Sequence, residues 1–271
     1  MPELPEVETT RRGIEPHINH HVINDLVVRN HALRWPVPRR LRSKISGQRI
    51  HAVDRRGKYI LLRFETGTVI IHLGMSGSLR VCPPGTPARK HDHVDFLLDN
   101  GLSLRLHDPR RFGAVLWTDK APERHKLLSS LGPEPLQEGF NAAYLHEQTR
   151  KRSASIKSVI MNSHIVVGVG NIYACESLFL AGINPKRRAG TLSMARCGKL
   201  VASIKQVLTE SITQGGTTLR DYIRENGQPG YFALRLRVYG KAGKPCPQCG
   251  KPIRQIKQQQ RSTFYCTHCQ R

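Results

Sequence analysis

The sequence predicts an α+β protein of 271 residues: an N-terminal antiparallel β-sandwich with flanking helices, a helical middle part and a C-terminal four-cysteine finger. Three observations carry this prediction. Short apolar runs separated by turn signals follow one another between residues 22 and 118. Helical periodicity replaces them beyond residue 140, and two Cys-x2-Cys pairs lie near the C-terminus.

The N-terminal part begins with a predicted helix and continues with strands. Residues 2–14 start acidic and end basic, which suits a helix dipole, and we expect Pro16 to interrupt this helix. The pair Asn100-Gly101 is typical of a tight hairpin. Leucines alternate with polar residues over 102–106, which predicts a strand with one buried face. Strands are expected at 59–64, 69–73, 76–81, 94–98, 102–106 and 114–117.

The middle part is predicted to be helical. A helix-breaking linker at 132–135 precedes it, and Ser153, Asn171 and Ser193 are expected to cap three helices. The glycine-rich turn 168–171 between the first two helices predicts a helix-turn-helix variant. We expect domain boundaries at 2–118, 132–234 and 237–271.

The charge of the chain points to a polyanionic partner. There are 43 Lys and Arg residues against 20 Asp and Glu residues, a net charge of +23. Such an excess favours nucleic acid first and an anionic membrane surface second, although a basic protein without catalytic activity also fits. The 38% hydrophobic content excludes a disordered chain, and no stretch approaches the ~18 apolar residues of a spanning helix. The start lacks a secretory signal, so we expect a cytoplasmic protein with reduced thiols.

Four cysteines have the spacing of a zinc site. Cys246 and Cys249 form one Cys-x2-Cys pair, and Cys266 and Cys269 form the second, with sixteen residues between the pairs. Four thiolates complete a closed tetrahedral shell, which predicts one structural Zn²⁺, with a redox dithiol pair as the alternative. Residues 235–271 hold nine Lys and Arg and no acidic residue, so we expect this finger to contact nucleic acid rather than serve only as a scaffold.

Two further features of the N-terminal part suggest chemistry. Lys58 lies in a second basic region, 29–63, directly before the strand at 59–64, where its amine can reach a pocket. Removal of Met1 would expose the secondary α-amine of Pro2, a main-chain group that titrates near neutrality. Such an amine can attack a sugar carbon and form an iminium ion, and Glu3 beside it can transfer protons. From these residues alone, a proline of no consequence and a helix-capping glutamate are the alternative.

Ten motifs run collinearly along the chain. They are MPELPEVETTRRGIEPH (1–17), RRGKYILL (55–62), IHLGMSGSLRV (71–81), KHDHVD (90–95), DPRRFGA (108–114), LGPEPL (131–136), VVGVGNIYACESLF (166–179), QGGTTLRDY (214–222), PGYFALRLRVYG (229–240) and QRSTFYC (260–266). In these motifs the sequence resembles the bacterial formamidopyrimidine-DNA glycosylases, also called 8-oxoguanine DNA glycosylases. The resemblance covers essentially the whole chain and implies a helix-two-turn-helix middle domain.

The resemblance implies a bifunctional enzyme of base-excision repair. It would remove oxidised purines (8-oxoguanine and formamidopyrimidines) from double-stranded DNA and then nick the strand at the abasic site by β,δ-elimination. Pro2 would be the Schiff-base nucleophile at C1′, and Glu3 the general acid and base. Lys58 would assist β-elimination, while Arg261 would contact the flanking phosphate and assist δ-elimination.

The resemblance also implies the residues that hold the DNA. Met75, Arg110 and Phe112 would fill the hole left by the everted nucleotide, since an apolar wedge must replace lost stacking and a guanidinium can meet the unpaired base. From the residues alone, Met75 and Phe112 would be interpreted as core. Phosphate contacts are implied for His91, Arg110, Arg152, Lys157 and Asn171. The damaged-base pocket would include Glu6 and, in the polar loop 217–233, Thr217, Thr218 and Tyr222.

Two alternatives stay open at this point. Endonuclease VIII, the pyrimidine-specific relative, shares the fold and the Pro-Glu start, but it typically has Gly where this chain has Leu4. A non-catalytic zinc-finger DNA-binding protein is the other alternative. Gly57 and Arg152 depart mildly from the family pattern, where Ala and Lys are expected. We expect a monomer in the bacterial cytoplasm, associated with the nucleoid through DNA.

Overall fold

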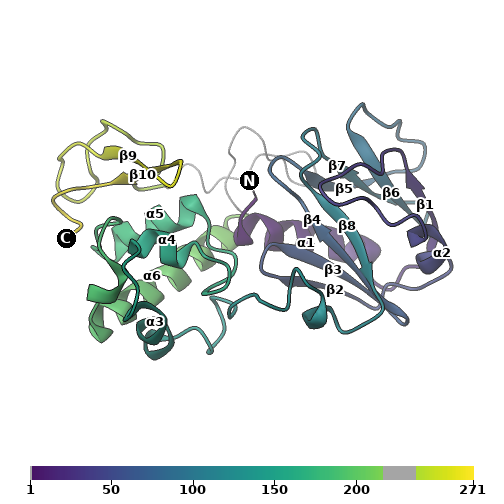
Figure 1. Cartoon of the computed structure of the whole chain (residues 1–271). Coiled ribbons are helices and arrows are strands. Elements are labelled where there is room, and N and C mark those ends of the chain that lie inside the picture. Colours follow the sequence, from purple (N-terminus) through teal and green to yellow (C-terminus); the bar gives the residue numbers. More distant parts are fainter. Residues whose placement is uncertain (1, 216–235) are drawn as a thin grey trace. The chain divides into compact units, whose positions relative to one another are not determined.

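The computed structural model describes residues 2–215 and 236–271, which belong to two compact units (Figure 1). The first unit contains the residues up to Ser130, and the second contains Leu131–Gln214 and the residues from 236 onward. The predicted α+β class and the antiparallel N-terminal sheets are confirmed. Among the described residues, no helix combines the length and the apolar character needed to cross a membrane.

Two four-stranded antiparallel sheets build the first unit. Their apolar faces share one buried core, which includes Ile60 and Ile71 from one sheet and Phe96 and Leu106 from the other. The first sheet has the order β2 (Ala52–Arg56), β3 (Tyr59–Phe64), β4 (Gly67–His72) and β8 (Ala114–Thr118). The second has the order β1 (Ile23–Val28), β6 (Asp92–Leu98), β7 (Ser103–His107) and β5 (Ser78–Cys82). Short helices α2 (Leu41–Ile45) and η1 (Pro122–Arg124) complete the unit.

Strand β7 corrects the prediction of a half-buried strand, because both of its faces are covered. Arg105, expected to face solvent, is only 4% exposed. It donates to both carboxylate oxygens of Asp95 on β6, each at 2.9 Å, and to the carbonyls of Thr86 and Pro87. The bidentate ion pair compensates the buried charge of Arg105. This side chain can therefore lie inside the protein, although it stands at a polar position of the alternating pattern.

Helix α1 (Leu4–Ile18) places the start of the chain against the sheets, where it contacts β2 and β3 of one sheet and β5 of the other. The expectation that Pro16 interrupts this helix is wrong, since the helix continues to Ile18. Proline lacks one N–H donor, and in the last turn this removes a single helical hydrogen bond. The N–H of Asn19 still donates to the carbonyl of Glu15 at 2.9 Å and closes the helix.

The second unit consists of helices followed by the finger hairpin. Ser193 caps α6 as predicted, but Ser155 rather than Ser153 caps α4, and Asn171 is the first residue of α5 rather than its cap. Both α3 and α5 pack against α6. The elements are α3 (Ala142–Thr149), α4 (Ile156–Ile160), α5 (Asn171–Leu180), η2 (Ala189–Thr191), α6 (Met194–Thr213), β9 (Arg254–Gln258) and β10 (Arg261–Tyr265).

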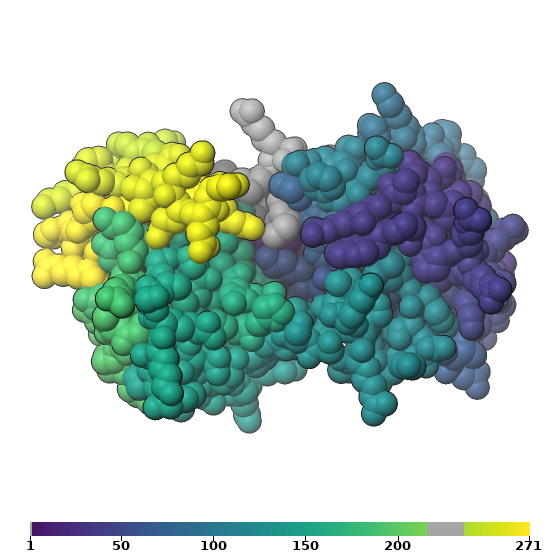
Figure 2. Space-filling model, viewed as in Figure 1, coloured from purple at the N-terminus to yellow at the C-terminus, as the bar shows by residue number. Residues whose placement is uncertain are grey.

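The finger completes its small core with side chains from α5. Cys175 and Phe179 of this helix join Val238, Ile253 and Phe264 in one buried apolar cluster. The finger therefore lies over the helices of its own unit, as Figure 2 shows. A segment of this size cannot bury enough apolar area alone, so this contact and a metal must both support it.

Candidate functional site

The predicted nucleophile and proton donor lie at the N-terminal end of α1. Pro2 is buried, and Glu3 is 3% exposed. Glu3 is the N-cap of the helix and forms a capping box with Glu6, whose Oε2 accepts the backbone N–H of Glu3 at 2.8 Å. The first turn of a helix stabilises carboxylates through its free N–H groups and its dipole. This arrangement holds the backbone of residues 2–3 in one place, which a reacting main-chain amine requires.

An ion cluster on α1 joins this helix to the turn that carries Lys58. Glu8 accepts hydrogen bonds from two arginines of its own helix and, at 3.0 Å, from Nε of Arg55 on β2. Arg55 in turn donates from Nη1 to the carbonyl of Gly57 at 2.9 Å, and Lys58 follows. Burial alone would raise the pKa of Glu8, but the hydrogen bonds and positive charge of these arginines lower it to about 2. The carboxylate stays ionised, and the Lys58 turn is fixed to α1.

Lys58 occupies the two-residue turn between β2 and β3, next to a neutral imidazole on β4. His72 packs against Tyr59 with ring centroids 4.8 Å apart. Burial, followed by the positive charges of Lys58 and Arg34, lowers the pKa of His72 to about 4. Its Nδ1 therefore acts as an acceptor and takes the N–H of Gly74 at 3.0 Å. The cations at this position suit a phosphate or another anionic group.

Met75 and the pair Arg110 and Phe112 lie on two turns of the first unit, after β4 and after β7 respectively. Phe112 is 41% exposed, so the alternative interpretation of this residue as core is wrong. The guanidinium carbon of Arg110 lies 4.9 Å from the centre of its ring. An exposed aromatic ring covered by a cation is typical of a contact surface rather than of a core.

In the second unit, Lys157 and Asn171 meet the hairpin that carries Arg261. Nζ of Lys157, a residue only 2% exposed, donates to Oγ1 of Thr263 at 2.6 Å and to the carbonyl of Ser262 at 3.3 Å. Nδ2 of Asn171 donates to the same Ser262 carbonyl at 2.9 Å. Arg261 is exposed and begins β10. Two helices therefore hold the strand that carries the predicted phosphate contact.

The hairpin reaches Arg261 through a strained two-residue turn. Gln259 and Gln260 have φ values of +45° and +61°, a left-handed conformation that favours glycine or asparagine. The sequence gives no turn signal there, because glutamine carries none. Strain of this kind persists where the surrounding contacts impose it, here those on Ser262 and Thr263.

Of the remaining predicted residues, only Glu6 has a described contact with the Pro2–Glu3 pair. Glu6 is 2% exposed and engaged in the capping box of α1. His91 is half-buried, with its ring 6.0 Å from that of His107, and Arg152 is exposed on the segment before α4. The predicted base-pocket residues Thr217, Thr218 and Tyr222 lie outside the described residues.

One buried acid of the second unit was not predicted. Glu176 on α5 is 0% exposed and accepts the backbone N–H groups of Arg237 at 2.8 Å, Val238 at 2.9 Å and Tyr239 at 2.8 Å. Three donors compensate the buried charge and tie the start of the finger to α5. A single charged residue in an otherwise uncharged helix was the available signal.

The four predicted cysteines come together at the end of the finger. Their Sγ atoms all lie within 4.8 Å of one another, with Cys246 and Cys269 at 3.9 Å and Cys249 and Cys266 at 3.5 Å. A tetrahedral ion with Zn–S bonds of about 2.3 Å requires sulfur–sulfur edges of about 3.8 Å. The residues fit one structural Zn²⁺, and no position is open for catalysis.

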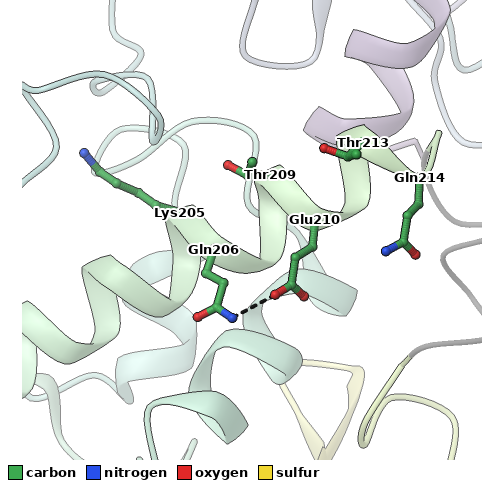
Figure 3. Close-up of a pocket in the computed structure, with 6 residues that line it drawn as sticks. All are labelled: Lys205, Gln206, Thr209, Glu210, Thr213 and Gln214. Carbon is green, nitrogen blue, oxygen red and sulfur yellow. Dashed lines mark hydrogen bonds between the residues drawn. The ribbon is translucent and has the colours of Figure 1, made fainter.

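Two surface hollows of the second unit lie apart from these residues. One, of about 420 Å³, follows α6, where Nε2 of Gln206 donates to Oε1 of Glu210 at 2.7 Å (Figure 3). Another, of about 430 Å³, is lined by Asn184, Lys186, Arg187, Arg188, Thr191 and Arg271. Neither hollow is lined by a predicted site residue, so neither belongs to the candidate site.

Family models match the chain in three successive segments. Residues 1–115 match the formamidopyrimidine-DNA glycosylase N-terminal domain, and residues 131–222 match the formamidopyrimidine-DNA glycosylase H2TH domain. Residues 243–271 match the zinc finger found in FPG and IleRS. Together the matches account for most of the chain and agree with the zinc assignment of the four cysteines.

Full-length relatives are similar in sequence and structure. The chain is 58% identical to the formamidopyrimidine-DNA glycosylase of Thioalkalivibrio sulfidiphilus, over 100% of both chains. The Lactococcus lactis protein, solved with DNA containing N7-benzyl-Fapy-dG, is 32% identical, with a TM-score of 0.92 over 100% of both chains. The same L. lactis protein has been solved with DNA containing an abasic site, with a TM-score of 0.92, and with DNA containing an oxidised pyrimidine, with a TM-score of 0.91. Both are 32% identical to this chain, with at least 99% of both chains covered.

The Glu8 cluster predicts a pH-dependent stability of the first unit. Because the folded-state pKa is lowered from 4.5 to about 2, the contribution of Glu8 is complete above pH 5 and is lost as the pH falls toward 2. Glu8→Gln should lower the free energy of unfolding by about 2–3 kcal/mol at pH 7, and by progressively less in acid. Urea unfolding followed by tryptophan fluorescence reports this unit, which contains both Trp35 and Trp117.

Glu15→Gln is the matched control, because Glu15 also pairs with Arg11 but its side chain is 38% exposed. It should change the free energy of unfolding by less than about 1 kcal/mol at any pH. An equal destabilisation by Glu8→Gln at pH 7 and pH 2.5 would show that the cluster is not the cause.

Metal content tests the finger. Wild-type protein should hold one zinc ion per chain, and Cys249→Ser should hold none. The amides of β9 and β10 should then exchange with solvent rapidly, because the finger lacks a sufficient core without metal, while those of β3 and β4 stay protected. Plasma mass spectrometry and hydrogen exchange measure both effects. Cys197→Ser, at a buried free cysteine of the same unit, should keep its zinc; zinc retention by Cys249→Ser would contradict the assignment.

Proposed function

The chain belongs to the formamidopyrimidine-DNA glycosylase family, and on that premise we propose that it removes oxidised purines from double-stranded DNA and then cleaves the strand at the abasic site. The observation that carries the proposal is the Pro2–Glu3 pair, held at the capped start of α1, the helix that Glu8 and Arg55 join to the Lys58 turn. One structural zinc ion holds the finger and takes no part in the chemistry.

Pro2 supplies the nucleophile once Met1 is removed. Its α-nitrogen attacks C1′ of the damaged nucleotide, the bond between C1′ and the base nitrogen breaks, and the base leaves with a proton that Glu3 delivers. The carboxylate of Glu3 then takes the proton from the nitrogen and passes it to O4′ of the sugar. The C1′–O4′ bond breaks, and the lone pair of the secondary nitrogen forms the C1′=N double bond of an iminium ion. Its positive charge draws electrons from the sugar and makes the next step an elimination rather than a hydrolysis.

Strand cleavage follows from the acidity of the iminium ion. Loss of a proton from C2′ forms the C2′=C3′ double bond, breaks the C3′–O bond and releases the 3′ phosphate. Loss of a proton from C4′ then breaks the C5′–O bond and releases the 5′ phosphate. We assign the first step to Lys58, whose turn is tied to α1 through Arg55, and the second to Arg261, at the phosphate beside the lesion. Hydrolysis of the remaining imine by water returns the free amine of Pro2.

The other predicted residues bind the substrate in this proposal. Met75, Arg110 and Phe112 enter the duplex where the damaged nucleotide has left it, and the exposure of Phe112 supports this role. His91, Arg152, Lys157 and Asn171 contact phosphates, and Glu6, Thr217, Thr218 and Tyr222 contact the damaged base. We also assign a monomeric state, a cytoplasmic location and an association with the nucleoid through DNA.

Oxidised pyrimidines are a second substrate class to consider. The L. lactis relative forms a complex with DNA that contains an oxidised pyrimidine. The matched domain models and the Met75, Arg110 and Phe112 set favour purines as the main substrates.

The position of the amine provides a direct test of the lyase step. One glycine added before Pro2 moves the terminal nitrogen by about 3.8 Å, the distance between successive Cα atoms. Strand cleavage at an abasic site should fall at least a hundredfold, while the affinity for duplex DNA changes less than threefold. Pro2→Gly, which keeps an amine in place, should retain a measurable fraction of the rate. Full cleavage by the extended chain, measured on denaturing gels, would exclude Pro2 as the nucleophile.

Lesion preference separates the two substrate classes. Under single-turnover conditions, the wild-type protein should release 8-oxoguanine from a duplex at least tenfold faster than thymine glycol from the same sequence. Binding to both duplexes, measured in parallel, controls for differences in affinity. Faster release of thymine glycol would assign the chain to the pyrimidine-specific activity.

A further inference from the structure

The turns that carry Met75 and Phe112 touch through their backbones. Gly74 has a φ of +67°, and a Cβ added there would lie 2.5 Å from the nitrogen of Gly113 and 2.5 Å from the carbonyl carbon of Phe112. A Cβ on Gly113 would lie 2.8 Å from the carbonyl oxygen of His72. Neither position can accept a side chain without separating the two turns. Met75 follows Gly74 and Phe112 precedes Gly113. The contact between the two turns therefore fixes the distance between the backbones of Met75 and Phe112.

Two side-chain acceptors hold the glycine N–H groups at this contact. Oδ2 of Asp108 accepts the N–H of Gly113 at 2.7 Å, and Nδ1 of His72 accepts the N–H of Gly74 at 3.0 Å. Asp108 is 0% exposed. Each turn is therefore held by a side chain from its own beginning, Asp108 directly after β7 and His72 at the end of β4, as well as by the other turn.

The backbone of Asp108 is itself held on three sides. Its N–H donates to the carbonyl of His91 at 2.9 Å, and its carbonyl accepts Nε2 of His93 at 2.9 Å and the N–H of Arg111 at 3.2 Å. Arg111 has a φ of +55°, a conformation that a non-glycine residue adopts at a cost. The turn from 108 to 113 is consequently held in one conformation, with Arg110 and Phe112 on its outer side.

The buried carboxylate itself is costly. Its second oxygen, Oδ1, has no hydrogen-bond donor among the residues that the structure describes. A buried anion with an unpaired oxygen lowers stability, and an apolar residue of the same volume would avoid this cost. The bond to Gly113 is thus retained at the expense of stability, and it closes the turn that carries the exposed ring of Phe112 and the guanidinium of Arg110.

We propose that Asp108 is a positioning residue that holds Met75, Arg110 and Phe112 as one preformed unit for insertion into the duplex. The inference rests on the proposed function, because it requires a nucleotide to leave the helix. A preformed unit enters the duplex without first losing backbone freedom, and ordering even one residue at that moment would slow insertion about tenfold. Asp108 itself touches neither the sugar nor the base.

Asp108→Leu tests this role, because leucine has the same number and branching of side-chain heavy atoms as aspartate and lacks an acceptor. The single-turnover rate of 8-oxoguanine release from duplex DNA should fall at least tenfold, and the fluorescence change of 2-aminopurine next to the lesion should slow equally. Cleavage of a single-stranded abasic oligonucleotide, which needs Pro2 but no insertion, should stay within threefold of wild type. Asp108→Asn keeps an acceptor for Gly113 and should restore release to within threefold.

Two comparisons separate positioning from general damage. Leu106→Ala, at a buried core residue of the same unit, should lower the melting temperature without lowering release at a temperature where the protein is folded. Combining Asp108→Leu with Phe112→Ala should slow release no more than Phe112→Ala alone, since both act through one unit. Equal loss on duplex and single-stranded substrates, or normal release by Asp108→Leu, would overturn the inference. A wild-type protein that releases no 8-oxoguanine would instead overturn the proposed function.

Discussion

The ion pair between Glu8 on α1 and Arg55 on β2 is the interaction on which the arrangement of the first unit depends. A main-chain amine can act as a nucleophile only if the chain end is held, and chain ends are normally the least ordered part of a protein. Glu8 fastens the first helix to β2 through Arg55, and Arg55 extends the connection to the backbone before Lys58. The groups assigned to base removal and to the first elimination, Pro2, Glu3 and Lys58, thereby belong to one fixed body, and the capping box of Glu3 and Glu6 orders the start of the helix.

The second unit uses buried polar groups for a comparable purpose. Glu176 gathers three consecutive N–H groups at the start of the finger, and the carbonyl of Ser262 receives donors from α4 and α5. Zinc closes one end of the finger, while these contacts fix the hairpin that presents Arg261. The net charge of +23 then has a defined role, since many cations draw in the phosphate backbone, whereas the reaction itself requires an uncharged amine.

Elements with a strong local signal were predictable from the sequence. The strands from 59 to 118 and the zinc ligands follow from apolar runs, turn residues and cysteine spacing, and their outcome agrees with the structure. Strands β1 and β2 were missed because Asn24, Asp25 and the sequence Asp54-Arg55-Arg56 make them polar. Residue roles depended on the resemblance, since Pro2 and Lys58 carry no distinctive local pattern. Contacts such as Glu8 with Arg55 join residues far apart in the sequence, and no periodicity reports them.

The most direct test of the account is to identify the atom that binds the sugar. Processed protein is mixed with a duplex containing 8-oxoguanine, the imine is reduced with borohydride, and the digested adduct is sequenced by tandem mass spectrometry. The account predicts one adduct per chain, on the α-nitrogen of Pro2. An adduct on the amine of Lys58, or no adduct from protein that still binds the duplex, would contradict it.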